Sequence, residues 1–452
     1  MDEQRPDGTA RRPADRFGPG RDQRPRRDES GNALWRQPPV GLGPRTWARG
    51  ARRLSQDQSG KHQYRAASVK LLIVGAGLGG LTAALALRRA GFDVEVHEAA
   101  NELGEVGAGL TLSRGAQAVF RDLGLQDRIA AHACRSMALP FVHYRTGRIL
   151  AGETDGATGQ PDDGTADVAR QIHRADLHRI LVEGFGEIGP PVQTGHRLVG
   201  LEQGVSAVEV RFANGARARG DALVAADGVR SAVRELLLGD DAPRFTGQVA
   251  YRFLVPSERA RPFLNLGRAA VFVGPRRTFN RYTLRGGAVL NCVGIAATDE
   301  WVGEGWSTPA TTAEMLDAFA GWHGDVTGLV ERAESAIKWG LFDRAPLGRW
   351  AHGRVTLLGD AAHAMLPFLG MGAAMAIEDG MILARAFATE REVGPAFARY
   401  EAARRPRTAL LHAKSVEQGV LTQARDPDAY DHHAAPAADP EILGYDPVAA
   451  AI

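Results

Sequence analysis

The 452-residue sequence contains only two cysteines, Cys134 and Cys292, which stand far apart and in no metal-like spacing. Neither a disulfide framework nor a zinc site is supported, so we expect no bound metal and a reducing, cytoplasmic compartment. Long hydrophobic runs are also scarce. The one candidate span, residues 71–87, is shorter than the roughly 20 residues that cross a bilayer and has glycines at its centre. We therefore expect no membrane association.

The chain as a whole has little excess of either charge, because its formal net charge is +2. Residues 1–65 hold 15 Lys and Arg against 8 Asp and Glu, so the remainder is net acidic. Their mixed charges and few aromatics argue against a nucleic-acid partner and favour a disordered basic extension over residues 1–66. The next methionine is Met137, inside the folded region, and we hypothesise that translation starts at a codon for Val69. Native peptides from the extension would contradict this hypothesis.

What the chain does contain is an alternation of strand and helix patterns. Residues 69–74 form a continuous apolar run that is typical of a buried parallel strand, residues 79–90 have helical spacing, and residues 93–98 read as a second strand. Residues 172–187 predict a further helix. From about residue 243 to 342, alternating segments punctuated by glycine and proline predict an antiparallel sheet.

These patterns predict an α/β fold in which a Rossmann-like domain with a parallel sheet carries an inserted antiparallel β-sheet domain and C-terminal helices. We expect residues 67–136, 168–240 and 345–390 to form the nucleotide-binding domain, residues 137–167 and 241–344 the inserted domain, and residues 391–452 the C-terminal helices and an irregular tail.

A glycine motif follows the first predicted strand. Gly75, Gly77 and Gly80 supply GxGxxG, in which one glycine makes a tight turn, one lets the backbone approach a pyrophosphate and one lets helix pack on strand. Leu78 lies within the motif and is included among the cofactor contacts. Glu98 ends the second strand, where its carboxylate can accept hydrogen bonds from both ribose hydroxyls. The motif predicts a dinucleotide site but does not separate FAD from NAD.

Three further segments decide between the two cofactors. They are Ala226–Ser231 (ADGVRS), Gly359–His363 (GDAAH) and His173–Leu177 (HRADL). In content and order these segments resemble the DG, GD and HRADL motifs of the single-component FAD-dependent aromatic hydroxylases, which share the p-hydroxybenzoate hydroxylase-like fold. The likeness is greatest to the salicylate hydroxylase branch and covers about residues 69–415.

The resemblance implies roles for several cofactor-binding residues. Asp227 would lie near the FAD pyrophosphate and affect the use of NAD(P)H, Asp360 would hold the ribityl chain, and Arg174 would reach the flavin. Ala108 and Gly109, in a glycine-rich loop, are expected to contact the cofactor as well. From the residues alone, Asp227 and Asp360 could instead be helix N-caps, and capping would not exclude a ligand role.

The segment after the GD motif is expected to border the reacting ring. Pro367 stiffens a loop there, and Gly372 and Ala373 begin a helix whose positive end would stabilise negative charge on a reduced flavin. His363 is expected to be structural. Many relatives have glutamine where this chain has Met371, and a thioether is a poor hydrogen-bond acceptor with no donor. A more apolar or differently oriented substrate becomes plausible.

Tyr251 and Arg252 resemble the strand segment that enters the catalytic cavity in this family. Tyr251 could orient or deprotonate a phenol, and Arg252 could attract a carboxylate. Because side chains alternate along a strand, only one of them can face the site. We predict Tyr251 as the catalytic residue, together with Pro367, and keep packing within the sheet as the alternative.

The function that the resemblance implies is an FAD-dependent monooxygenase that hydroxylates a small aromatic substrate, phenolic or salicylate-like, with NAD(P)H and O2 through a flavin C4a-hydroperoxide. The alternative is a flavin-dependent oxidoreductase on the same scaffold that does not insert oxygen. An NAD-dependent dehydrogenase is disfavoured by the DG and GD segments, and a flavin-binding sensor of an aromatic ligand stays open. We expect a monomer or a homodimer.

Overall fold

The described part of the chain, in a computed structural model, comprises residues 69–104, 109–135, 139–152, 169–239, 243–299, 308–430 and 439–452. All of these residues fall in one compact unit. The expected extension 1–66 and the predicted cofactor residue Ala108 lie outside the described residues.

The expected parallel sheet is present. Its strands follow the order β18 (Ala351–His352), β19 (Val355–Leu357), β11 (Ala222–Ala225), β1 (Lys70–Val74) and β2 (Asp93–His97). β1 pairs in parallel with both β11 and β2, and only β18 runs antiparallel. The apolar run that predicted β1 is buried on both faces, as a central parallel strand should be. Burial of each large aliphatic side chain stabilises this core by about 1.5–3 kcal/mol.

Helices pack closely against this sheet. α1 (Leu78–Arg89) contacts α10 (Gly372–Glu390) and α4 (Arg174–Gly186). The approach of α1 to α10 depends on Gly380, because a Cβ there would lie 2.6 Å from the backbone nitrogen of Ala83. α4 begins two residues later than predicted, because residues 170–173 form strand β7 and the His173 side chain caps the helix by accepting a hydrogen bond from the Ala175 N–H.

A larger, mostly antiparallel sheet confirms the second predicted pattern. Within the described residues its eight strands follow the order β16 (Thr308–Ala310), β17 (Ala336–Asp343), β12 (Arg244–Pro256), β15 (Val289–Ala297), β14 (Arg277–Leu284), β13 (Ala270–Gly274), β5 (Phe141–His143) and β6 (Ile149–Ala151). Only the pairing of β13 with β5 is parallel.

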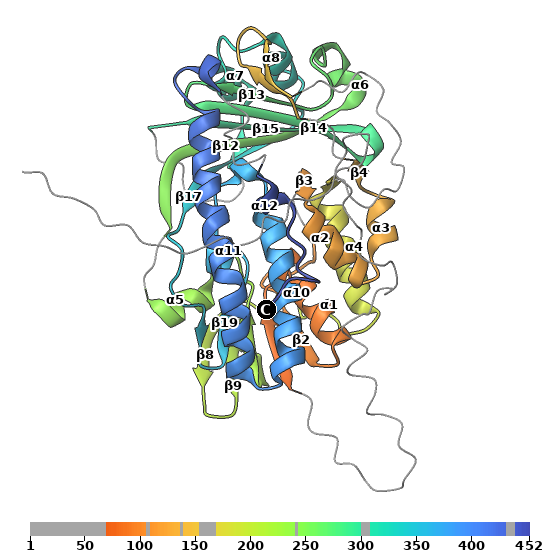
Figure 1. Cartoon of the computed structure of the whole chain (residues 1–452), viewed down its shortest axis with the longest axis vertical. Helices are drawn as coiled ribbons and strands as arrows, with labels where there is room; N and C mark the ends of the chain where they lie inside the picture. The colour runs from red at the N-terminus through yellow and green to blue at the C-terminus, as the bar shows by residue number, and fades with distance from the viewer. Residues whose placement is uncertain are drawn as a thin grey trace, which may run out of the picture. The chain divides into compact units, whose positions relative to one another are not determined.

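The two faces of this sheet have different neighbours. On one face, α7 (Thr312–Ala318) and α8 (Gly324–Val330) cover a core cluster that includes Tyr251 and Phe319. On the other face, Leu366 and Phe368 from the loop before α10 pack on the strands. Figure 1 shows α7 and α8 on one side of the sheet and the long helices α10 and α11 (Val393–Thr422) on the other.

Two small sheets and several short helices complete the described structure. The first sheet has the strand order β10 (Arg217–Gly220), β9 (Val208–Phe212) and β8 (Leu198–Gln203). The second has the order β3 (Gly109–Leu112), β7 (Arg170–His173) and β4 (Cys134–Arg135). The helices are α2 (Arg114–Asp122), α3 (Gln126–Ala130), α5 (Ala232–Leu238), α6 (Ser257–Ala260), η2 (Arg261–Phe263), η3 (Arg285–Gly287), α9 (Asp360–His363), η4 (Pro367–Leu369), η5 (Pro427–Ala429) and α12 (Pro440–Leu443).

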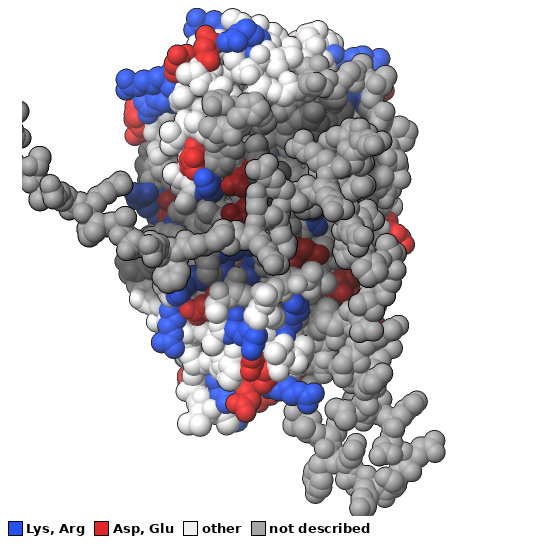
Figure 2. All heavy atoms as spheres, viewed as in Figure 1, with Lys and Arg blue, Asp and Glu red and all other residues white. Residues whose placement is uncertain are grey.

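The charges on the surface and the length and hydropathy of the helices were compared with what a charged partner or a membrane would require. On the face drawn in Figure 2, lysine and arginine side chains of the described residues lie beside aspartate and glutamate. Among the helices that the structure describes, none combines the length and the apolar character needed to cross a membrane.

Candidate active site

The predicted glycine turn joins β1 to α1. Gly75 has a φ of +103°, and a Cβ there would lie 2.3 Å from the Ala226 carbonyl oxygen, so only glycine fits. A Cβ at Gly80 would lie 2.0 Å from the Gly75 oxygen, whereas one at Gly77 would meet nothing within 4 Å. The backbone is therefore open to an approaching group at Gly77. Leu78 opens α1, whose N-terminus has no side-chain cap.

Glu98 lies against this turn, as the spacing predicts. Its Oε2 accepts a hydrogen bond from the Ala76 N–H at 2.8 Å, and its Oε1 accepts one from the Ala100 N–H at 2.8 Å. Two backbone donors thus fix the carboxylate beside the glycine turn. Each carboxylate oxygen keeps further lone pairs for a diol such as a ribose.

Asp360 and Arg174 are far apart in the sequence, but the charge of Asp360 acts on Arg174 in the fold. Asp360 is exposed at the start of α9, and its carboxylate makes no hydrogen bond among the described residues. The N-cap alternative for Asp360 is therefore wrong. Burial lowers the pKa of Arg174, and the charge of Asp360 opposes that shift. The site thus has a carboxylate with free acceptors whose charge acts on a half-buried cation.

Asp227 behaves differently. Its Oδ1 accepts a hydrogen bond from the Ser231 hydroxyl at 2.5 Å, and its Oδ2 accepts one from the Val233 N–H at 3.2 Å. Burial raises the pKa of Asp227, and these hydrogen bonds oppose the rise. Asp227 thus supports the first turn of α5, but the N-cap of that helix is Ser231, so the N-cap alternative for Asp227 is wrong. Gly228 beside Asp227 turns the chain with a φ of +78°.

Asp379 of α10 fixes the GD turn through hydrogen bonds. Asp379 Oδ2 accepts a hydrogen bond from the Gly359 N–H at 3.0 Å and lies 2.5 Å from His363 Nε2. Asp379 Oδ1 accepts a hydrogen bond from Arg404 Nε at 2.6 Å. Burial alone would raise the pKa of Asp379, but His363 and Arg404 outweigh it and lower the pKa to about 2. His363 is therefore structural, as predicted.

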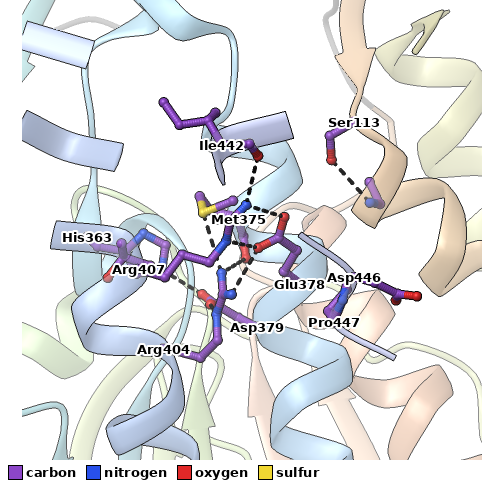
Figure 3. A network of polar contacts seen from close by, with 12 residues as sticks. Ser113, His363, Met375, Glu378, Asp379, Arg404, Arg407, Ile442, Asp446 and Pro447 are labelled. Carbon is purple, nitrogen blue, oxygen red and sulfur yellow. Dashed lines mark hydrogen bonds and ion pairs between the residues drawn. The ribbon is translucent and has the colours of Figure 1, made fainter. Parts of the chain in front are cut away.

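Further charges surround Asp379 (Figure 3). Arg404 Nη1 donates to Glu378 Oε2 at 2.9 Å, and Arg407 Nε donates to the same oxygen at 2.9 Å. The Arg407 guanidinium lies 3.9 Å from the ring centre of Tyr445. Glu378, Asp379 and Arg404 are fully buried. We call Glu378, Asp379, His363, Arg404 and Arg407 the Asp379 network.

The loop before α10 is fixed to α11. The Ser415 hydroxyl donates to the Leu366 carbonyl at 2.6 Å, and Pro367 begins η4. Gly372 begins α10, followed by Ala373, and the helix has no side-chain cap. The Met371 side chain is buried in the main core cluster. The thioether that replaces a glutamine therefore packs into the core.

The structure places Tyr251 on the sheet face that α7 and α8 cover. Its hydroxyl donates to Glu314 Oε1 at 3.3 Å, and that same oxygen lies 2.5 Å from Lys338 Nζ. Burial, followed by Glu314, raises the pKa of Tyr251 to about 12. Leu366 and Phe368 pack on the opposite face. The packing of Tyr251 therefore argues against the catalytic role predicted for it and matches the alternative of packing within the sheet.

Arg252, the next residue, points to the other face. Its guanidinium lies 5.0 Å from the ring centre of Trp339 and makes no hydrogen bond or ion pair among the described residues. Its Nε is buried without a partner. Burial lowers the pKa of Arg252, while Tyr282 opposes the shift and Arg174 adds to it. Arg252 is thus a half-buried cation near Arg174, with no acidic partner among the described residues.

Gly109 links this face to β3. Its N–H donates to Asn291 Oδ1 at 3.0 Å, and a Cβ at Gly109 would lie 2.4 Å from the Tyr282 ring. The sequence-predicted residues Gly109 and Arg174 therefore lie near the sheet face that carries Arg252. The Asp379 network was not predicted, although two adjacent acids inside an apolar stretch of α10 were a signal for buried ion pairs.

Comparisons with known proteins place the chain in a family. A family profile described as "FAD binding domain" matches residues 68–415. The chain is 36% identical to a 3-amino-4-hydroxybenzoate 2-monooxygenase of Streptomyces platensis, over 77% of this chain and 87% of that protein. It is 32% identical to a 6-hydroxynicotinate 3-monooxygenase of Pseudomonas fluorescens, over 83% and 98%. A salicylate hydroxylase substrate complex superposes with a TM-score of 0.69 at 25% identity, covering 84% of this chain and 96% of that one.

Proposed function

The chain belongs to the FAD binding domain family, and on that premise we propose that it is a monooxygenase that hydroxylates a small aromatic acid with NAD(P)H and O2. The overall reaction consumes the arene, NAD(P)H, a proton and O2, and yields the hydroxylated arene, NAD(P)+ and water. The observation that carries the substrate class is Arg252, a half-buried cation without an acidic partner among the described residues.

The described residues fit FAD. The open backbone at Gly77 and the uncapped start of α1 suit a pyrophosphate, and Glu98 suits an adenosine ribose. The exposed carboxylate of Asp360 has free acceptors for ribityl hydroxyls, and its charge acts on Arg174. When bound, FAD supplies the electron transfer from NAD(P)H and the activation of O2. With FAD at these residues, the part of the chain with the parallel sheet would be the FAD-binding domain, and the part with the large antiparallel sheet would be the substrate domain.

Arg252 would hold the substrate by its acid group. A guanidinium can pair with a carboxylate through two parallel hydrogen bonds, and the pairing is strong where water is scarce. Apolar side chains on the same face, including Trp339, Leu366 and Phe368, would surround the ring and exclude water. The substrates for which two relatives are named, 3-amino-4-hydroxybenzoate and 6-hydroxynicotinate, are aromatic acids and support this choice.

Isotope incorporation tests the proposal. The purified yellow protein is supplied with NADH or NADPH, a panel of aromatic acids and 18O-labelled O2, while NAD(P)H loss and product mass are followed together. We expect one labelled oxygen atom in the product. Turnover of NAD(P)H with an altered product that lacks the label would support the oxidoreductase instead, and ligand binding with no stimulated NAD(P)H oxidation would support a sensor.

A further inference from the structure

A row of three residues crosses the middle of the large sheet. Arg252 of β12 stands opposite Val293 of β15, and Val293 stands opposite Asn280 of β14. Opposed residues on paired strands project from the same face, so Val293 and Asn280 share the face of Arg252. All three are partly accessible, whereas Phe253, Cys292 and other neighbours that point to the opposite face are buried.

The polar ends of this row lack hydrogen-bond partners among the described residues. Arg252 Nε and Asn280 Oδ1 are both buried without a hydrogen bond, and neither side chain makes one elsewhere among the described residues. Asn291 on the same face is satisfied at its oxygen, because Oδ1 accepts the Gly109 N–H at 3.0 Å, whereas its Nδ2 is also buried without a partner. Buried polar atoms in native proteins are generally satisfied. Those of Asn280 and Arg252 therefore point to a ligand that satisfies both.

The spacing of the row sets the size of that ligand. Neighbouring strands lie about 4.8 Å apart, so the backbones that carry Arg252 and Asn280 are separated by roughly 10 Å. Val293 supplies an apolar floor between them. A single aromatic ring with polar substituents at its two ends can bridge this distance while its face rests on the valine.

We propose that Asn280 determines specificity by accepting a hydrogen bond from a hydroxyl or amino group on the substrate ring, at the end remote from the acid group that Arg252 holds. The substrate class is then an arenecarboxylate with an O–H or N–H donor in the meta or para position. This inference rests on the proposed function, because it assumes that the acid group binds Arg252.

Equilibrium binding to the FAD-loaded protein tests the role of Asn280 without turnover. In the absence of NAD(P)H, the change in flavin absorbance is titrated with benzoate, 3- and 4-hydroxybenzoate and the matching methoxybenzoates. The parent protein should bind the better hydroxybenzoate about tenfold more tightly than its methoxy partner, because the ether cannot donate a hydrogen bond. Asn280→Leu should abolish that preference and leave the Kd of benzoate unchanged.

Two further variants serve as controls for Asn280→Leu. Asn280→Asp keeps an acceptor oxygen and should keep the preference for hydroxyl over methoxy, even if all acids bind more weakly. Thr278→Val removes a hydroxyl from the same strand and face and should change nothing. A hydroxyl preference that survives in Asn280→Leu, or equal binding of methoxy and hydroxy acids by the parent, would overturn the role of Asn280. If no aromatic acid perturbs the flavin, the proposed function itself fails.

Discussion

Two groups of buried polar side chains lie on either side of the loop that precedes α10, and they differ in how far their hydrogen bonds are satisfied. In the Asp379 network, Asp379 and Glu378 each accept from two or more partners, and Arg404 donates to both acids. On the sheet face, the Arg252 guanidinium lies over the ring of Trp339 and has no hydrogen bond or ion pair among the described residues. The acids and the Arg404 guanidinium of the first group are paired without a ligand, although His363 Nδ1 is buried without a partner. The Arg252 guanidinium of the second group is not paired among the described residues.

This difference separates a structural role from a binding role. A buried charge that lacks a partner is costly, and a protein retains one where a ligand supplies the missing charge. The Asp379 network ties the GD turn to α10 and α11, so it supports the cofactor residues indirectly. Arg252 contributes nothing comparable to folding, and we therefore assign it to the substrate.

The largest expected effect is the loss of the Asp379 network. Asp379→Ala removes the acceptor of Gly359, His363 and Arg404 and leaves Arg404 with one acid. We expect a loss of about 3–5 kcal/mol in the free energy of unfolding and weaker FAD binding, measured by denaturant titration and by flavin release. Asp379→Asn, which keeps the shape, should be milder. Unchanged stability in Asp379→Ala would remove the contrast between the two regions.

The second effect concerns Arg252. Arg252→Met should weaken the binding of aromatic acids about 100-fold, since hydrogen bonds to charged groups are among the stronger ones, and should leave stability equal or higher. The measurement is a titration of the change in flavin absorbance with benzoate and with benzamide. The affinity for benzamide, which carries no charge, should hardly change. Arg277→Met on the opposite face is the matched control. A marked loss of stability in Arg252→Met would show that this cation has a structural role instead.

The third effect is the pH dependence of the Asp379 network. The pKa of Asp379 falls from 3.8 to about 2 on folding. A lowered carboxyl pKa stabilises the fold above the unfolded value, and this stabilisation is lost as the pH falls from 3.8 towards 2. The gap in unfolding free energy between the parent and Asp379→Asn should therefore narrow across that window in urea titrations. A gap that stays constant there would refute the assignment.

The smallest effect is expected at Tyr251. Tyr251→Phe removes a 3.3 Å hydrogen bond to Glu314, whose oxygen keeps Lys338 as a partner. We expect a stability loss of about 1 kcal/mol or less and no change in the affinity for aromatic acids. Glu314→Gln serves as the paired control on α7. A Tyr251→Phe variant that folds normally but loses acid binding would restore the original prediction for Tyr251.

The sequence predicted the features that depend on local motifs better than those that depend on long-range packing. The glycine turn and Glu98 follow from spacing within one βαβ unit, and the structure places them together. Alternation along β12 predicted that only one of Tyr251 and Arg252 could face the site. Which of the two faces it depends on where α7 and α8 pack, and the local pattern of the strand does not contain that information. The Asp379 network joins two helices through Arg404, so its pairing was equally hidden.

A crystal structure of the FAD-loaded protein with a bound aromatic acid tests the central assignment most directly. The assignment predicts that the carboxylate pairs with the Arg252 guanidinium and that the ring lies over Val293, on the face opposite Tyr251. A ring bound elsewhere, or a carboxylate that points away from Arg252, would contradict it.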